Sequence, residues 1–355
     1  MQFGLSEEQI LLLDNVNRFL DDNSPLDRVR LYADGGDDAD IWAGLAELGV
    51  PALLVPEAQG GIGLNPLDAA IVAESLGAHI TPSPFLGTAV MAPTALVASG
   101  GNHDDLLAEI AAGTHRVGIA FSEAIKRRND ARVEARDSRL FGKSLFAFDA
   151  DANSYLVADQ NKHLYLVAAQ DPGLTRTHLT TVDKTRRTVE LTYDDVAAQC
   201  ISTDVGVFER VLDIGRVAIA ADTLGAAQNM LDQAVEYAKQ REQFNRPIGS
   251  FQAVKHMCAE MAAQLEPCRS MVWFAGHALA ELPEEARVTA CHTKAHLAEV
   301  AQFVAKTATE VHGGMGFTDL VGLHYWFKRC GANRQLLGAP EFVRQEAAVL
   351  QGLPD

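Results

Sequence analysis

A guanidinium, side-chain amides and aromatic rings are concentrated in one short segment of the chain, residues 241–252, which reads Arg-Glu-Gln-Phe-Asn-Arg-Pro-Ile-Gly-Ser-Phe-Gln. The planar fork of Arg241 suits the oxygens of a pyrophosphate, and Phe244 can cover a heterocycle beside it. Pro247 and Gly249 favour a turn between two amphipathic helical runs. The segment therefore indicates a loop that binds a ligand with both phosphates and a ring.

A glycine-rich break follows further along the chain, in residues 311–317, which read Val-His-Gly-Gly-Met-Gly-Phe. Glycine allows the backbone to approach a flat or phosphorylated ligand closely. A simple turn between two helices would use the same glycines, and the two interpretations are compatible. His312 is interpreted as a packed or hydrogen-bonded histidine, and its position beside the glycines also permits contact with a ligand.

The segments around these motifs predict three parts. Residues 1–115 read as helical, starting at Ser6 and interrupted by the glycine-rich loop 60–64. Residues 116–205 contain short runs rich in β-formers between polar turns, which predict a small antiparallel sheet. Residues 206–355 return to long helical runs. The expected fold class is α+β and mainly α, with domains at 1–115, 116–205 and 206–355.

The composition excludes several kinds of partner. Of the 355 residues, 48% are hydrophobic and 22% charged, as in ordinary globular proteins, and the net charge of -17 argues against nucleic acid and anionic membranes. No stretch approaches the apolar length of a membrane span, and residues 1–8 lack a signal pattern, so a cytoplasmic protein is expected. The five cysteines are scattered, which predicts buried reduced thiols and neither a disulfide nor a metal site.

Both motifs, in this order, closely resemble the segments by which acyl-CoA dehydrogenases bind FAD. The resemblance covers essentially the whole chain and includes Glu-Leu-Gly-Val (47–50), Val-Pro-Glu (55–57), Gly-Gly-Ile-Gly (60–63), Ala-Glu-Ser-Leu-Gly (73–77) and Leu-Gly-Ala-Ala (224–227). The chain is identified as a member of that family. The resemblance implies a helical N-terminal domain, a middle β-domain and a C-terminal four-helix bundle. It also implies FAD as cofactor, an acyl-CoA substrate and an acceptor similar to electron-transfer flavoprotein.

The resemblance further implies which residues contact FAD. In the family the cofactor lies at a subunit interface, where one β-domain holds the flavin and the neighbouring chain contacts the adenine–diphosphate end. A carboxylate removes the proton next to the thioester carbonyl, while the β-hydrogen leaves as hydride to the flavin. The residues of this chain that match the family's adenine–diphosphate contacts are Arg241, Gln243, Phe244, Ile248, Gln252, Glu310, Val311, His312, Gly313 and Gly314.

The catalytic glutamate of the family has no counterpart in this chain. The corresponding stretch, residues 335–341, reads Gln-Leu-Leu-Gly-Ala-Pro-Glu, and the base position falls on Gly338. Some relatives carry the glutamate on the first bundle helix, at a position that falls on Gly215. Glycine cannot accept a proton, so no family-type base is expected. A base moved to Glu341, three residues after Gly338 and on roughly the same helical face, is the alternative.

The flavin pocket of the β-domain also departs from the family pattern. The family has a Thr-Glu segment, then Gly-Ser-Asp, then Trp-Ile-Thr or Trp-Ile-Ser. This chain has Phe-Ser-Glu-Ala (121–124), then Ile-Lys-Arg-Arg (125–128), then Lys-Ser-Leu-Phe-Ala-Phe (143–148). The basic run 126–128 is either a solvated charge run or an attraction for the phosphates of CoA.

These departures predict a division of labour. A paralogue that keeps the base and the flavin pocket could form working sites with this chain, because each interface takes different parts from its two sides. The chain resembles the base-lacking subunit of heteromeric (α2β2) acyl-CoA dehydrogenases of actinobacterial steroid side-chain degradation. The alternatives are a self-sufficient dehydrogenase that uses Glu341 and a structural or regulatory paralogue without a role in the chemistry.

Overall fold

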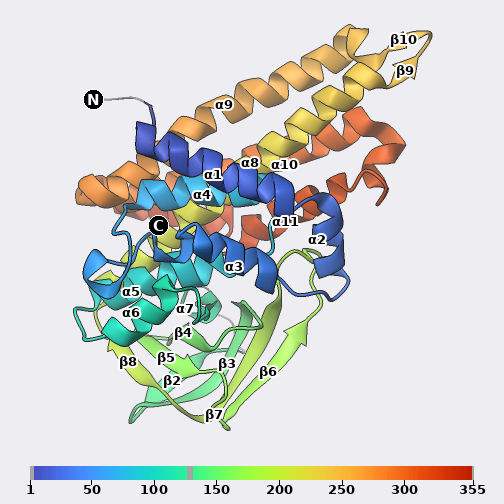
Figure 1. The fold of residues 1–355 in the computed structure, drawn as a ribbon. Coiled ribbons are helices and arrows are strands. Elements are labelled where there is room, and N and C mark those ends of the chain that lie inside the picture. The colour runs from blue at the N-terminus through green and yellow to red at the C-terminus, as the bar shows by residue number, and fades with distance from the viewer. Residues whose placement is uncertain (1–3, 126–130, 354–355) are drawn as a thin grey trace.

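The computed structural model describes residues 4–125 and 131–353. Figure 1 shows a β-sheet at one end of the molecule, long C-terminal helices at the other, and the N-terminal helices alongside both. The mainly helical α+β class and the order helices, sheet, helices are therefore confirmed. The basic run 126–128 lies outside the described residues.

The first part is helical, as its periodicity predicts. Helix α1 begins after Ser6, whose Oγ accepts a hydrogen bond from the Gln9 N–H at 3.2 Å, while Gln9 Oε1 accepts from the Ser6 N–H at 3.0 Å. The helices of this part are α1 (Glu7–Asn23), α2 (Leu26–Ala33), α3 (Ala39–Glu47), α4 (Pro66–Ala78), α5 (Ala92–Ala98) and α6 (Asp104–Ala111), with the shorter η1 (Val50–Ala52), η2 (Glu57–Gln59) and η3 (Leu86–Met91).

The middle part is a mixed sheet rather than a purely antiparallel one. Its strands are β1 (Val117–Ala120), β2 (Val133–Arg136), β3 (Arg139–Phe148), β4 (Ser154–Ala158), β5 (Leu164–Ala168), β6 (Leu174–Leu179), β7 (Thr188–Ala197) and β8 (Gln199–Ser202), with the short α7 (Ser122–Ile125) after β1. The order is β6-β7-β3-β1-β4-β5-β8, and β2 pairs with β3. Strands β1 and β4 are parallel, with Val117 opposite Ser154. A parallel pair needs a long connection, and the chain between the end of β1 and the start of β4 is long enough to provide one. The antiparallel expectation is wrong for that pair.

The last part is built around a long central helix. Helix α8 (Val205–Gln240) packs against α4, α9 (Gln252–Glu281), α10 (Pro283–His312) and α11 (Leu323–Gln335). Helix α12 (Pro340–Leu350) packs against α10. Between α8 and α9 lies a two-stranded hairpin of β9 (Glu242–Gln243) and β10 (Arg246–Pro247), which projects from the end of the molecule in Figure 1. After it comes the short η4 (Ile248–Ser250), and η5 (Gly313–Phe317) follows α10.

Two hydrophobic cores share the sheet. The larger core runs without interruption from Leu20 in α1 through Leu156 in β4 to Val217 in α8. The second core includes Tyr155 and Val157, the neighbours of Leu156, because successive side chains of a strand point to opposite faces. The larger core contains residues from both sides of each expected boundary, 115/116 and 205/206. The packing therefore does not test the division into three domains, which stays a prediction.

The cysteines are free thiols, but they are not all buried. Cys268, Cys291 and Cys330 are buried, whereas Cys258 is half-buried and Cys200 is exposed on β8, at the edge of the sheet. The expectation of buried thiols is therefore wrong for Cys200 and only partly met at Cys258. Within the described residues, no helix has the length and apolar character needed to cross a membrane.

Candidate functional site

The arginine-containing loop is a tight β-hairpin at the end of α8. The Arg241 N–H closes the helix by donating to Tyr237 O at 2.8 Å, and its carbonyl accepts from the Ile248 N–H at 2.7 Å. Arg246 pairs with Gln243 across the hairpin. The two residues between them, Phe244 (φ 53°) and Asn245 (φ 59°), both have positive φ, as the favoured two-residue hairpin turn requires.

Phe244 is a strained residue at the tip of this hairpin. A bulky side chain with positive φ is a true outlier, and such strain costs on the order of 1–3 kcal/mol. The ring is 87% exposed and touches Phe251 edge-on, with the ring centroids 6.1 Å apart. The strained backbone and the exposed ring make Phe244 a candidate for contact with a ligand or a partner.

The other predicted residues of this loop are accessible. Arg241, Gln243 and Gln252 are exposed, and Ile248 is half-buried against the end of α8. Lys239, two residues earlier, is paired with Glu236 at 2.5 Å, so its charge is compensated. Arg241 has no ion pair or side-chain hydrogen bond among the described residues. Its guanidinium is thus available for an external anion.

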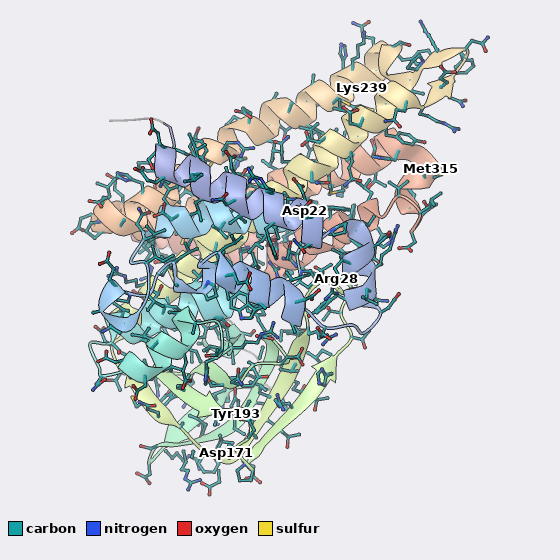
Figure 2. All side chains as sticks on the ribbon, in the orientation of Figure 1. Asp22, Arg28, Asp171, Tyr193, Lys239 and Met315 are labelled. Carbon is teal, nitrogen blue, oxygen red and sulfur yellow. The ribbon has the colours of Figure 1, made fainter. Side chains whose placement is uncertain are left out.

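The glycine-rich segment lies beside the hairpin because His312 stacks on Tyr237. Their ring centroids are 4.5 Å apart, and Tyr237 lies one helical turn before Arg241. Figure 2 shows Lys239 of α8 and Met315 of η5 at the same end of the molecule. Two motifs far apart in the sequence therefore form one surface.

The predicted residues of the glycine-rich segment differ in accessibility. His312 is buried, its Nδ1 lies 2.8 Å from Ala308 O, and burial lowers its pKa, so it is the packed histidine that was expected. A Cβ built on Gly313 or Gly314 would meet no atom within 4 Å, so their backbone borders open space. Glu310 is exposed, whereas Val311 packs into the larger core and presents little surface to a ligand.

A cavity of about 450 Å³ lies between the sheet and helices α11 and α12. Its volume is within the range of small-molecule sites, roughly 300–1,000 Å³. Its walls are mainly apolar, and Gly338 forms part of one wall. The lining residues are Phe121, Ser122, Ile125, Phe146, Phe148, Thr181, Val182, Asp183, Arg186, Thr188, Gly331, Ala332, Gln335, Leu336, Leu337, Gly338, Ala339 and Phe342.

Of the two empty base positions, Gly338 lines this cavity, and Gly215 adjoins Leu337, another residue of its wall. A Cβ on Gly215 would lie 2.7 Å from Leu337 Cδ1 and 2.8 Å from Met91 Sδ, so the space for a side chain is already filled. Gly338, directly after Leu337, has φ +113°, a conformation that side chains rarely adopt. Neither position could carry a glutamate without rearrangement of the backbone or its neighbours.

The turn at Gly338 is held by two buried basic side chains. Arg216 Nε donates to Leu337 O at 3.0 Å, and Lys294 Nζ donates to Gly338 O at 3.2 Å and to Arg334 O at 3.3 Å. Lys294 is 2% exposed, and burial, with Arg216 and Arg334 nearby, lowers its pKa to about 7. These side chains fix the backbone at one of the two positions where the family resemblance places the base.

Glu341 is poorly placed to replace the missing base. It lies in the first turn of α12, its side chain is 67% exposed, and Oε1 accepts a hydrogen bond from Arg334 at 2.8 Å. That hydrogen bond lowers the pKa of Glu341, which makes it a weaker base. The described carboxylate that lines the cavity is Asp183, and its Oδ1 already accepts from the N–H and Oγ1 of Thr185.

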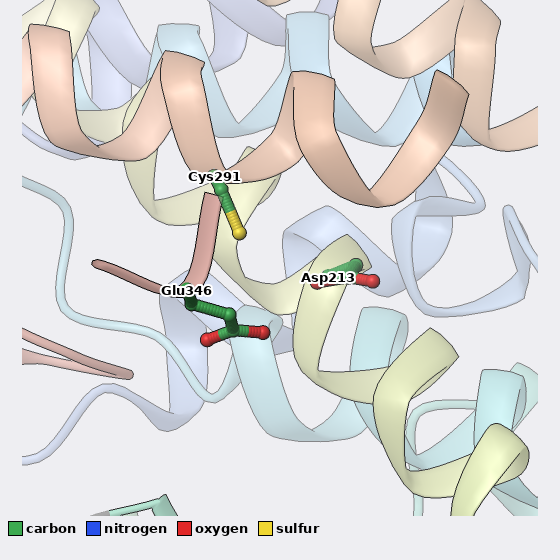
Figure 3. Close-up of side chains that lie close together, drawn as sticks. All are labelled: Asp213, Cys291 and Glu346. Carbon is green, nitrogen blue, oxygen red and sulfur yellow. The ribbon is translucent and has the colours of Figure 1, made fainter. Parts of the chain in front are cut away.

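One described cluster, Asp213, Cys291 and Glu346, has the proximity that a metal site needs (Figure 3). The Arg216 guanidinium already fills it, 3.5 Å from Asp213, 3.3 Å from Cys291 Sγ and 2.7 Å from Glu346. Burial nevertheless raises the pKa of Asp213 to about 7. The cluster therefore binds an internal cation and anchors the side chain that holds Leu337.

Comparison with known proteins identifies the chain's relatives. Models of the acyl-CoA dehydrogenase N-terminal and C-terminal domains match residues 6–114 and 205–348. Acyl-CoA dehydrogenase IpdE2 of Mycobacterium tuberculosis is 31% identical over 89% of this chain and 88% of its own length. IpdE2 of Mycolicibacterium smegmatis is 30% identical over 97% of this chain and 100% of its own length.

Solved structures agree with these relatives. A chain of the ChsE4-ChsE5 complex from Mycobacterium tuberculosis superposes with a TM-score of 0.89 at 25% identity, covering 100% of both chains. A variant of the steroid ACAD Tcur3481-Tcur3483 also gives a TM-score of 0.89, at 26% identity and 98% coverage of both chains. The matches define a class, the oxidoreductases that act on acyl-CoA. The chain belongs to the acyl-CoA dehydrogenase family.

Several residues of the site were not expected from the sequence. Tyr237 lies one helical turn before Arg241, and that spacing could have indicated it. Arg216 directly follows the empty position Gly215, which was a usable signal as well. The sequence contained no signal for Lys294, because it contacts Gly338 only through the packing of α10 against the α11–α12 turn.

Proposed function

We propose that this chain is the accessory subunit of a heteromeric, α2β2, FAD-dependent acyl-CoA dehydrogenase. It supplies the adenine–diphosphate half-site to a paralogous partner subunit, and the partner carries the catalytic base. The observation that carries the proposal is a contrast within one molecule. The hairpin presents a strained, exposed Phe244, whereas the two positions for a base, Gly215 and Gly338, are glycines whose side-chain space is taken by neighbouring side chains.

The residues at the hairpin have the chemistry of the adenine–diphosphate end of FAD. Arg241 would bind the diphosphate through its open guanidinium, and Phe244 would pack on the ring or ribose. Gln243 and Gln252 add exposed amide donors, and the open backbone at Gly313 and Gly314 allows close approach. When bound, FAD supplies the hydride acceptor of the reaction, and these residues only bind and orient it.

Among the described residues at the cavity, neither Gly338 nor Gly215 offers a side chain that could take up the substrate proton at the family's base positions. Lys294 and Arg216 use their donors on the carbonyls of Gly338 and Leu337, and Glu341 is bound to Arg334 at the surface. A base from the partner's own cavity would therefore remove the α-proton of the acyl-CoA.

The relatives support a partner and a substrate class. The ChsE4-ChsE5 structure is a complex of two different chains, and the Tcur3481-Tcur3483 enzyme is described as a steroid ACAD. We extend these properties to this chain as a proposal: its partner is a paralogous acyl-CoA dehydrogenase subunit, and its substrate is a steroid-type acyl-CoA. Electrons would pass to an acceptor of the electron-transfer flavoprotein kind.

The test is the FAD content and mass of the purified chain, alone and co-expressed with a candidate paralogue. We expect flavin and a heterotetrameric mass only with the partner. Arg241→Ala in the heteromer should weaken FAD binding by about 2–3 kcal/mol, the cost of a lost charged contact. The matched control is Arg210→Ala, which removes an exposed arginine elsewhere on α8. Stoichiometric FAD and turnover in the lone chain would overturn the proposal.

The two alternatives make different predictions in the same experiment. A self-sufficient enzyme would lose its turnover on Glu341→Gln, a change that the accessory-subunit proposal expects to be neutral. A purely structural paralogue would leave the partner's FAD content unchanged when Arg241 is replaced. The exposed, ion-paired position of Glu341 disfavours the first alternative, and the strained Phe244 disfavours the second.

A further inference from the structure

Arg246 is a second exposed arginine of the hairpin, and none of the family-derived contacts includes it. Its guanidinium carbon lies 4.0 Å from the centroid of the Phe251 ring, which is a cation–π contact. Within the described part of the chain it makes no ion pair or side-chain hydrogen bond. One face of the guanidinium is therefore covered, while its hydrogen-bonding edges are not engaged.

The register of the hairpin places Arg246 on the same face as the expected FAD contacts. Gln243 and Arg246 are directly opposite each other, so their side chains project from one face. The Ile248 N–H donates to Arg241 O, which makes Arg241 and Ile248 the next opposed pair two residues along. Arg241, Gln243, Arg246 and Ile248 therefore share a face, and Glu242 and Pro247 alternate to the other.

The aromatic residues around Arg246 hold it in place. Phe251 supports the guanidinium from one side and meets Phe244 edge-on, with ring centroids 6.1 Å apart. Phe251 is itself fixed as the residue that precedes α9. A long side chain loses much rotational freedom when it binds a ligand, and a pre-formed stack reduces that loss.

The charge of the hairpin is opposite to that of the whole molecule. The chain has a net charge of -17, whereas residues 241–252 contain two arginines and one glutamate, a net charge of +1. The glutamate, Glu242, projects from the other face. A diphosphate carries two negative charges, so a face with two arginines matches it better than a face with Arg241 alone.

We infer that Arg246 is a second anion-binding residue of the hairpin and that Arg241 and Arg246 together bind the two phosphates of a dinucleotide. This rests on the proposed function in one respect, since the rest of the cofactor site belongs to the partner. In this arrangement Arg246 also contributes to specificity, because it favours a cofactor with a diphosphate over one with a single phosphate.

The test uses the co-expressed heteromer and its dissociation constants for FAD and FMN. We expect Arg246→Gln to weaken FAD binding about tenfold, to reduce the salt dependence of that binding, and to leave FMN binding nearly unchanged. Arg246→Lys keeps the charge but loses the flat stack, so it should keep the salt dependence with weaker binding. Arg210→Gln is the charge-matched control, and the mass of each heteromer shows that assembly is intact.

The outcomes separate this inference from the proposed function. In one outcome Arg241→Ala loses FAD affinity, while Arg246→Gln binds FAD as tightly as the Arg210→Gln control. That result would overturn the role of Arg246 and leave the accessory-subunit proposal standing. An equal loss of FAD and FMN affinity on Arg246→Gln would also overturn it, because the effect would then not come from the diphosphate. If neither Arg241→Ala nor Arg246→Gln changes FAD binding, both proposals are overturned.

Discussion

Phe244 is the residue at which local stability and binding oppose each other. Asparagine tolerates positive φ much better than phenylalanine does, so Phe244→Asn should raise the free energy of unfolding by about 1 kcal/mol. The same change should weaken FAD binding in the heteromer, because the exposed ring is lost. Urea unfolding of the chain and FAD titration of the heteromer measure the two effects.

A control variant separates strain from the loss of an aromatic ring. Phe274 is 43% exposed within helix α9, where its backbone is regular. Phe274→Asn should lower stability, since asparagine is a poorer residue than phenylalanine for packing on a helix surface. If Phe244→Asn lowered stability as much as Phe274→Asn, the strain argument for a presented aromatic ring would fail.

Lys294 makes a specific prediction about pH. Its pKa of about 7 in the folded protein lies below the ordinary value of 10.5, so between these values the unfolded chain binds one more proton. The stability of the protein therefore gains a contribution that rises with pH from about 7 to 10, by up to about 1.4 kcal/mol per unit. Lys294→Met should make the pH dependence shallower by that amount, whereas Lys306→Met, on an exposed position of the same helix, should not. Urea unfolding at pH 7, 8 and 9 provides the comparison, and equal slopes for both variants would contradict the burial argument.

The residues with strong local patterns could be predicted from the sequence, and those placed by tertiary packing could not. Arg241, Phe244 and the glycines at 313–314 occupy contiguous motifs, and the structure makes one surface of them. The contact of Lys294 with Gly338 depends instead on how α10 meets a turn many residues later. Val311 belongs to the same motif, but its side chain packs into the larger core, so its contact with a cofactor stays a prediction.

At the scale of elements, the meeting of α8 with the turn between α11 and α12 closes one of the two base positions. Gly215→Ala should destabilise the protein by about 1–3 kcal/mol, because the new methyl would meet Leu337 and Met91 at less than 3 Å. Gly331→Ala, on α11, has no atom within 4 Å of the new Cβ and should stabilise by about 0.5–1 kcal/mol. Thermal unfolding of both variants gives the contrast.

A double-mutant cycle identifies the cause of that effect. In a Leu337→Ala background the space beside Gly215 is partly vacated, so Gly215→Ala should cost at least about 1 kcal/mol less. Additive effects of the two substitutions would mean that Leu337 does not close this position. The base could then be restored there more easily than the structure indicates.

The elements themselves were largely visible in the sequence, with one instructive exception. Helical periodicity and glycine breaks located the long helices, including the break between α10 and α11. The parallel pairing of β1 with β4 was not visible, because alternation indicates a strand but not its neighbour. The intervening β2 and β3 return the chain so that β4 adds to the free side of β1.

At the scale of the whole molecule, a buried ionic network connects all three parts of the chain. Asp222 of α8 accepts from Arg329 of α11 at 2.8 and 3.0 Å, and Arg186, from the β6–β7 loop, lies 3.0 Å away. Arg329 also donates to Thr185 Oγ1 at 2.7 Å and approaches Thr81 O in the N-terminal part at 3.5 Å. The relative positions of the cavity walls, which come from the sheet and from α11, thus depend on one carboxylate.

Asp222→Asn should therefore destabilise the molecule far more than an ordinary charge removal. It removes the carboxylate that pairs with the buried Arg329 and the half-buried Arg186, which costs about 3–5 kcal/mol. Asp232→Asn, further along α8, is the control, because that exposed side chain only accepts from Gln228. Equal losses of thermal stability in the two variants would show that the network does not hold the parts together.

The network also gives the direction of the acid response. Burial opposes the charge on Asp222, but Arg186 and Arg329 outweigh it and hold the pKa of Asp222 below its ordinary value of 3.8. Its stabilising contribution is therefore complete above that value and is lost as the pH falls below it, because the unfolded chain then binds a proton at this carboxylate that the folded protein does not. Wild type should lose stability steeply below about pH 4, and the part of that loss due to Asp222 should be missing in Asp222→Asn. Unfolding free energies between pH 3 and pH 6 test this, and because Asp222 connects the sheet to α11, the sheet and the helices should unfold together in wild type throughout that range.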